Sequence, residues 1–112
     1  MNNKYIKNES KEIHISKNGF NVNLPKIANK DISICFVETL NGRDNYCMLN
    51  TSTMFYYIIE GNGNFIINDE KFSVKSDDLI EIPPKHKYTY IGNLKMLEVQ
   101  TPAFNLNDLQ EF

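Results

Sequence analysis

Few side chains in this sequence are suited to proton transfer. The chain has two histidines, His14 and His86, and a pair of imidazoles alone provides too few ligands for a metal site. General acid–base catalysis needs a titratable group beside a pocket. The candidates are Tyr88, His86 two residues before it, and Glu60 at the end of an apolar run. For Glu60, a solvated carboxylate at a turn is the competing interpretation.

The two cysteines, Cys35 and Cys47, form no C-x-x-C motif, and each lies in an apolar run that resembles a strand. In a protein of the reducing cytosol this pattern predicts two buried free thiols. A disulfide between neighbouring strands is the alternative, and the spacing in the sequence does not decide between them.

Length and composition indicate one globular domain, residues 1–112, with 41% hydrophobic residues and a formal net charge of −2. This charge gives no basic face for binding nucleic acid. No apolar run approaches the roughly 20 residues that cross a bilayer, and no apolar block follows the N-terminal lysines. We therefore expect a cytoplasmic protein. Among the basic residues only Arg43 is an arginine, and asparagine is abundant, which suggests an AT-rich bacterial genome.

Short segments rich in β-branched and aromatic residues follow one another at regular spacing, which is typical of a sandwich or barrel. Gly61-Asn62-Gly63 and Gly92-Asn93 are predicted turns, so residues 54–67 should form a hairpin. The C-terminal residues can form one helical turn that packs Leu106, Leu109 and Phe112 on the barrel. The predicted strands are 12–16, 20–24, 32–40, 45–50, 54–60, 64–68, 70–75, 78–82, 87–91 and 94–101.

Two segments place glycine and proline in the pattern of the small single-domain cupins, which are double-stranded β-helix (jelly-roll) barrels of the RmlC-like type. The first cupin motif begins and ends with Gly and carries two His and a Glu between them. The second carries Gly, Pro, Gly, His and Asn. The resemblance covers about residues 31–102. On this chain the first motif runs from Gly42 to Gly61 and puts Met48, Asn50 and Met54 at the metal ligands, and the second falls on Asp77, Pro83, Lys85, Tyr88 and Gly92.

In metal-dependent cupins the three His and the Glu hold a divalent ion. Here the four positions carry Met48, Asn50, Met54 and Tyr88, a donor set that suits no first-row divalent ion. The resemblance therefore predicts a cupin without a metal or other cofactor. A soft Cu(I) site of Met48, Met54 and Cys47 is disfavoured, because consecutive residues on a strand point to opposite faces.

The resemblance also implies an inner face, because ligand positions of the family point into the barrel. Extending them by the two-residue period of a strand gives an apolar, aromatic lining with a few polar tips. Such a lining suits a small organic ligand with a ring face, a sugar or a flat heterocycle, while a filled core is the alternative. The facing of Glu38 and Glu98 stays open. The expected lining residues are Met48, Asn50, Met54, Tyr56, Ile58, Tyr88 and Tyr90.

The sequence thus predicts a bacterial cupin domain that binds a small organic ligand without a metal. One alternative is a sugar or nucleotide-sugar isomerase or epimerase with Tyr88 and His86 as acid and base. Another is a metal-dependent cupin enzyme with ligands outside the motifs. We expect a homodimer, with the strand around Ile13 and Ile15 at the interface, and neither nucleic acid nor membrane as a partner.

Overall fold

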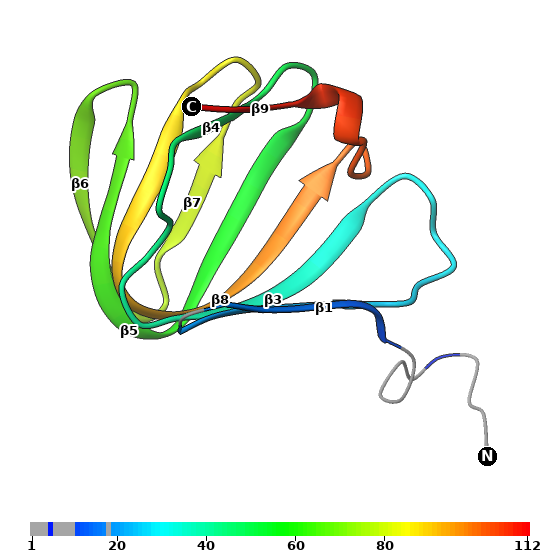
Figure 1. Ribbon diagram of the computed structural model, residues 1–112, viewed down its shortest axis with the longest axis horizontal. Helices are drawn as coiled ribbons and strands as arrows, with labels where there is room; N and C mark the ends of the chain where they lie inside the picture. Colours follow the sequence, from blue (N-terminus) through cyan, green and yellow to red (C-terminus); the bar gives the residue numbers. More distant parts are fainter. Residues whose placement is uncertain (1–4, 6–10, 18) are drawn as a thin grey trace.

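The computed structural model describes Tyr5, residues 11–17 and residues 19–112, and within 11–17 it describes a side chain only at Ser16. The described residues form nine strands and one turn of 3-10 helix, as an all-β fold (Figure 1). None of them belongs to a helix long and apolar enough to cross a membrane. The elements are β1 Lys11–Lys17, β2 Phe20–Pro25, β3 Ser33–Thr39, β4 Cys47–Leu49, β5 Thr53–Ile67, β6 Glu70–Lys75, β7 Leu79–Ile82, β8 Tyr88–Thr101, η1 Leu106–Asp108 and β9 Leu109–Glu111.

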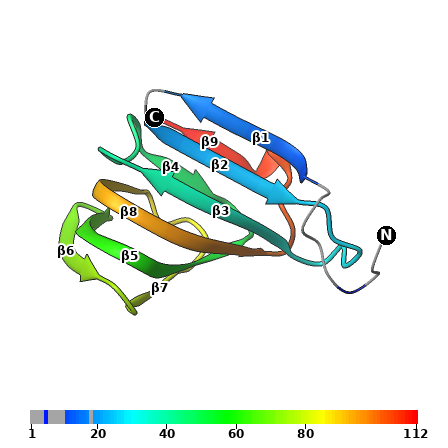
Figure 2. The same cartoon turned by 90° about the horizontal axis from the view of Figure 1, so that it is seen from below.

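The two long strands β5 and β8 organise the sheet, because they pair with each other along their whole length, from Thr53 opposite Thr101 to Ile67 opposite Tyr88. Outside this pair, β3 and β7 extend one end of it, and β4 and β6 extend the other. The sheet therefore curls into an open barrel of two layers. Figure 2 shows β1, β2, β3, β8 and β5 side by side in one layer, in the order that the pairing gives.

The expected turns at Gly61-Asn62-Gly63 and Gly92-Asn93 are wrong, since all of these residues lie inside β5 or β8. Gly63 lies opposite Gly92 where the two strands bend together. A Cβ added to Gly63 would lie 2.2 Å from the carbonyl oxygen of Ile91. These glycines therefore allow the two backbones to approach closely at a bend. In a short stretch of sequence, this role of glycine cannot be distinguished from a turn.

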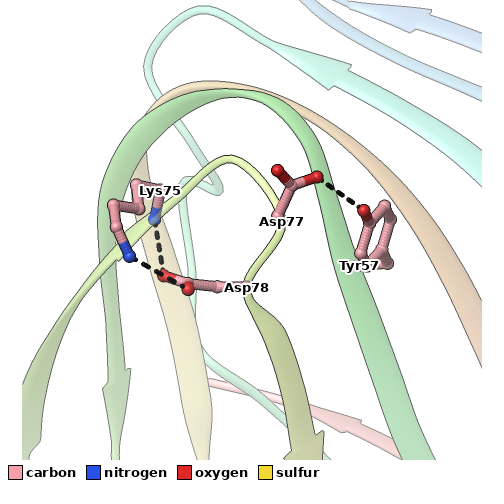
Figure 3. Close-up of polar contacts among 4 residues, drawn as sticks. All are labelled: Tyr57, Lys75, Asp77 and Asp78. Carbon is pink, nitrogen blue, oxygen red and sulfur yellow. Dashed lines mark hydrogen bonds and ion pairs between the residues drawn. The ribbon is translucent and has the colours of Figure 1, made fainter.

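Two turn positions support the register of the second cupin motif. Asp77 and Lys85 stand where the family has glycine, and both adopt the left-handed backbone conformation that glycine favours, with φ of 76° and 64°. Figure 3 shows the turn at Asp77, where its carboxylate accepts a 2.7 Å hydrogen bond from the hydroxyl of Tyr57. In the same turn Asp78 accepts a hydrogen bond from the Lys75 amide over 2.9 Å.

The core lies between the two layers and follows the strand period. On β5 the buried side chains include Met54, Tyr56 and Ile58, as the sequence predicts. The inner face extends across the sheet, because residues directly opposite each other on neighbouring strands point to the same side. The core residues are Cys35, Val37, Cys47, Leu49, Met54, Tyr56, Ile58, Phe65, Val74, Ile82, Tyr88, Tyr90, Leu94 and Met96.

The expected inward direction of Met48 and Asn50 needs correction. Cys47 lies opposite Tyr88, so it shares the inner face with that residue. Cys47 and Leu49 are accordingly buried, whereas Met48 and Asn50 between and after them keep part of their surface exposed. The motif spacing correctly predicts a strand in this segment. It is wrong about which alternate residues of that strand point into the barrel.

The C-terminal end of the chain differs in detail from the expectation, whereas the N-terminal strand is present as expected. The C-terminal turn exists as η1, but Leu106 and Phe112 are exposed and only Leu109 packs against the core. Residues 109–111 instead form β9, which pairs with β4. The N-terminal strand exists as β1, at the edge beyond β2. The side chains of Ile13, His14 and Ile15 lie outside the described residues, so the expected role of this strand in a dimer stays a prediction.

Candidate functional site

Three tyrosines meet inside the barrel, Tyr56 from β5 and Tyr88 and Tyr90 from β8, each at most 2% exposed. The hydroxyls of Tyr56 and Tyr88 are 2.7 Å apart and share a hydrogen bond. The ring of Tyr56 lies edge-on to both other rings, with centroid distances of 5.9 Å to Tyr88 and 5.6 Å to Tyr90. This arrangement is favourable for aromatic rings and fixes the directions of the hydroxyls. Below, these three residues are called the tyrosine cluster.

Glu98 joins the tyrosine cluster from the middle of β8. It lies opposite Cys35 on one side and Tyr56 on the other, so its side chain is on the inner face, and it keeps part of its surface exposed. The thiol of Cys35 donates to Glu98 Oε2 over 3.1 Å. The open question about facing is thereby answered: Glu98 points inward and Glu38 is exposed.

Burial raises the pKa of Glu98 above its ordinary value, because a carboxylate loses solvation inside the barrel. The hydrogen bond from Cys35, the charge of Arg43 and the nearby phenol of Tyr56 act in the opposite direction without cancelling the effect of burial. Glu98 therefore holds its proton to higher pH than a solvated glutamate. The pKa of this carboxyl group is thus shifted toward neutral pH.

The neighbouring acids remain protonated at neutral pH. Burial raises the pKa of Tyr56 and of Tyr88 well above the ordinary phenol value, and it raises the pKa of Tyr90 as well. Burial also raises the pKa values of Cys35 and Cys47, which are free and buried thiols, as the sequence predicts. These groups can donate hydrogen bonds to a ligand but cannot serve as bases near neutral pH.

Arg43 supplies the positive charge of the site. It lies just before β4, where its backbone N–H donates to the carbonyl oxygen of Tyr90 over 3.0 Å. Its guanidinium is partly buried, and its charge acts on the tyrosine cluster and on Cys47. Sequence reasoning noted Arg43 only as a sign of genome composition, because it precedes the strand and follows no periodic pattern.

Gln100 lies two residues after Glu98 on the inner face and is 5% exposed. Its Nε2 group is buried and finds no hydrogen-bond partner, within the part of the chain described. A buried amide donor without a partner is costly. Alternation along β8 from Glu98 would have found this residue, had the facing of that strand been known.

The other acid–base candidates lie outside the tyrosine cluster. Nδ1 of His86 is 2.9 Å from the carbonyl oxygen of Pro84 in the connection between β7 and β8. Glu60 is exposed on β5, where it forms an ion pair with Lys95 over 3.5 Å. Of the acid–base candidates, only Tyr88 lies among the buried ionisable groups.

The residues at the metal positions of the cupin motif do not fit a divalent ion. Met48 is off the inner face, and Asn50 uses its side-chain N–H₂ to donate to the carbonyl oxygen of Asp108 over 3.2 Å. Met54 and Tyr88 contribute a thioether and a protonated phenol. Nowhere among the described residues do three or more His, Cys, Asp or Glu side chains gather in a way that could hold a metal.

Comparison with solved structures identifies the architecture. The nucleoside dehydratase Pac13 is 26% identical over 93% of this chain and 86% of its own, with a TM-score of 0.86. A Streptomyces Pac13 variant with a His-to-Gln substitution, bound to uridine, is 25% identical over 89% of this chain and 83% of its own, with a TM-score of 0.84. An RmlC-like cupin from Shewanella frigidimarina is 15% identical over 85% of this chain and 86% of its own, with a TM-score of 0.70. The fold is a cupin double-stranded β-helix.

Sequence comparisons add less than the structural ones. No family model matches it. The uncharacterized protein MJ1618 of Methanocaldococcus jannaschii is 45% identical over 64 residues, which are 54% of this chain and 51% of that protein. The chain thus spans about half the length of the curated relative it matches.

Proposed function

We propose that this cupin barrel binds a small organic molecule of the nucleoside type and transfers a proton on it without a metal. The ligand class is supported by the Pac13 structures that contain uridine, which resemble this chain at about 25% identity over most of its length. Two of those variants exchange a tyrosine for phenylalanine. Tyr56, Tyr88 and Tyr90 carry the ring faces and hydroxyl donors that suit a heterocycle or sugar. They are at most 2% exposed, so this binding requires the barrel to open.

The observation that carries the catalytic part is the position of Glu98 on the inner face directly opposite Tyr56, whose hydroxyl bonds to Tyr88. A carboxylate with a raised pKa can take a proton from carbon, and a protonated phenol can donate to a leaving oxygen. In an elimination of water, one C–H bond and the C–O bond on the neighbouring carbon break. A C=C bond forms, the proton passes to Glu98, and the hydroxyl leaves as water with a proton that Glu98 or a phenol supplies. The balance needs no oxidant and no second substrate.

The proposal that no metal takes part in the reaction rests on the side chains at the motif positions, which do not fit a divalent ion. Elemental analysis of the purified protein tests it directly. Stoichiometric Fe, Mn, Ni, Zn or Cu that survives dialysis against a chelator would contradict this part of the proposal and favour a metal-dependent cupin with ligands outside the motifs.

The ligand and the reaction are tested together by NMR titration with uridine, followed by incubation with a panel of nucleosides and mass analysis. We expect saturable shifts of the tyrosine cluster and a product lighter by one water. Shifts without any product would support a second candidate, a binding module without turnover. Absence of both would contradict the nucleoside class.

The isomerase or epimerase alternative with Tyr88 and His86 remains a proposal of lower rank, because His86 contacts Pro84 in a connection outside the cluster. A homodimer and a cytoplasmic, bacterial origin also remain proposals. Sedimentation analysis tests the dimer.

A further inference from the structure

The layer that contains β3, β8, β5 and β7 has an apolar outer face. An antiparallel sheet that packs one face on a core normally presents polar side chains on the other face. Here one row of outward-facing residues crosses the four strands, each residue directly opposite the next: Phe36, Leu97, Tyr57 and Leu79. In the neighbouring row, Val99 opposite Phe55 continues the apolar surface. Below, these six residues are called the outer patch.

The same two long strands are polar on the outside where they enter the other layer. There the outward-facing Asn64 lies opposite Ser73 on one side and Ile91 on the other, and Asn62 lies opposite Lys75. The apolar outer face is therefore a property of one layer rather than of long strands in general. A contiguous apolar face of this kind marks a surface that another molecule covers.

The outer patch is large enough for a stable interface. Phe36 is 47% exposed, Tyr57 38% and Leu79 64%. With the 150–250 Å² that large apolar side chains can bury, these three leave about 200–400 Å² uncovered, to which the half-buried residues of the patch add. A standard interface takes about 800 Å² from each partner, of which a little more than half is apolar.

Tyr57 is ordered at the edge of the outer patch. Its hydroxyl donates to the carboxylate of Asp77 over 2.7 Å, which fixes the direction of the ring (Figure 3). An aromatic side chain that is already fixed loses little conformational freedom when a partner covers it, and tyrosine is enriched among residues that dominate binding energy. The patch is thus prepared for association.

The charges next to the outer patch complement a second copy of the same face. Lys95 lies directly opposite Glu60, and the two form an ion pair over 3.5 Å. A two-fold axis parallel to the strands, between β8 and β5, would place Lys95 over the partner's Glu60 and Glu60 over the partner's Lys95. The four charges would then alternate in sign, which sets register and specificity more than affinity. The same axis would place Leu97 over the partner's Tyr57.

We propose that the outer patch is the interface of a symmetric homodimer in which this layer packs face to face against the same layer of a second copy. Two sheets that pack in this way keep their strand directions within about 30° of each other. The outer patch supplies the affinity, and Lys95 with Glu60 sets the register. The proposal does not depend on the identity of the ligand. The edge strand β1 of the same layer offers the competing interface.

Sedimentation velocity tests the proposal, over about 1–100 μM protein, a range that detects dissociation constants of micromolar order. We expect a dimer. Phe36→Lys should weaken it at least about 30-fold, because a symmetric interface contains the substitution twice. Phe72→Lys is the matched control, since Phe72 is 43% exposed but belongs to β6 in the other layer, and this variant should dimerise normally.

A charge reversal tests the register of the two copies. Lys95→Glu would gather four carboxylates at the two-fold axis and should weaken the dimer about three- to tenfold. Combining it with Glu60→Lys restores the alternation of charges and should restore the dimer. Thermal unfolding monitored by circular dichroism establishes that each variant is folded.

A monomer over the whole concentration range overturns the proposal. A dimer that Phe36→Lys leaves intact also overturns it and favours the edge of β1. Equal weakening by Phe36→Lys and Phe72→Lys overturns the assignment to this layer. A dimer that Phe36→Lys disrupts but Lys95→Glu does not weaken supports the outer patch and overturns the two-fold register.

Discussion

The thiol of Cys35 on β3 donates a hydrogen bond to Glu98 Oε2 on β8 across 3.1 Å. A buried cysteine thus assists a carboxylate, not as a nucleophile but as a donor that makes ionisation easier. Burial alone would raise the pKa of Glu98 further than the whole environment does. The relationship yields a prediction that does not depend on knowing the substrate.

Replacing Cys35 by alanine removes this donor, so the pKa of Glu98 should rise further. Cys35→Ser keeps a hydroxyl donor at the same place and should cause a smaller shift or none. The measurement is a ¹³C NMR titration of the Glu98 carboxyl group. A pKa of Glu98 that stays constant in Cys35→Ala would contradict the assigned hydrogen bond.

Glu98→Gln should abolish proton transfer while preserving shape. We expect turnover to fall by about 10²–10⁴-fold, the usual contribution of a general acid–base group, with ligand affinity nearly unchanged. Glu38→Gln is the matched control, because Glu38 is an exposed glutamate on the neighbouring strand β3 and should retain full turnover. Equal losses in both variants would indicate a general effect of charge rather than catalysis.

The stability of the fold should depend on the protonation of Glu98. Because its folded pKa lies above the unfolded value of about 4.5, the folded state binds the proton more tightly. The resulting stabilisation is complete below the unfolded pKa and is lost as pH rises through the folded pKa. Urea unfolding across the acidic to neutral range should therefore show a decline with pH that Glu98→Gln flattens. An identical slope in both proteins would argue against the raised pKa.

The hydrogen bond between Tyr56 and Tyr88 can be tested by a double-mutant cycle. Either Tyr→Phe change leaves one buried hydroxyl with a lost partner and should cost about 1–2 kcal/mol of unfolding free energy. The double variant should cost less than the sum, with a coupling of about 1 kcal/mol. Tyr57→Phe, which removes an exposed hydrogen bond to Asp77, serves as the control and should cost no more than about 0.5 kcal/mol. Strict additivity would mean that the two hydroxyls do not interact.

The bend in the central strands predicts a strong effect of a single methyl group. Gly63→Ala would push a Cβ to within 2.2 Å of Ile91 O, so we expect a loss of about 3 kcal/mol or more in unfolding free energy. Asn62→Ala at the neighbouring exposed position should change stability by about 0.5 kcal/mol or less. Thermal unfolding monitored by circular dichroism measures both. A stable Gly63→Ala variant would show that the strands can move apart.

The sequence was most informative where a pattern is local. The family resemblance, extended by alternation over residues 54–58, predicted the inner face of β5, and the glycine and proline spacing predicted the cupin fold. Prediction from the sequence fails where pairing between distant segments decides the local structure. Gly61-Asn62-Gly63 has the composition of a turn, yet β8 keeps it extended.

The candidate site, too, is predicted where the pattern is local and missed where distant strands meet. Tyr56, Tyr88 and Tyr90 were predicted from the motif and the strand period, and the structure buries all three. Sequence patterns do not reveal Arg43 and Gln100 as site residues, nor the direction of the Glu98 side chain, because these depend on which strand lies beside them. Met48 was assigned to the wrong face because a three-residue strand gives too little alternation to fix its direction.

The continuous pairing of β5 with β8 also determines how the molecule should come apart. Since each of these strands belongs to both layers, neither layer can lose its central pair without disrupting the other. The barrel therefore has no natural boundary along which one half could open while the other persists. We expect a cooperative loss of structure, with hydrogen exchange in the middle of β5 and β8 limited by global unfolding.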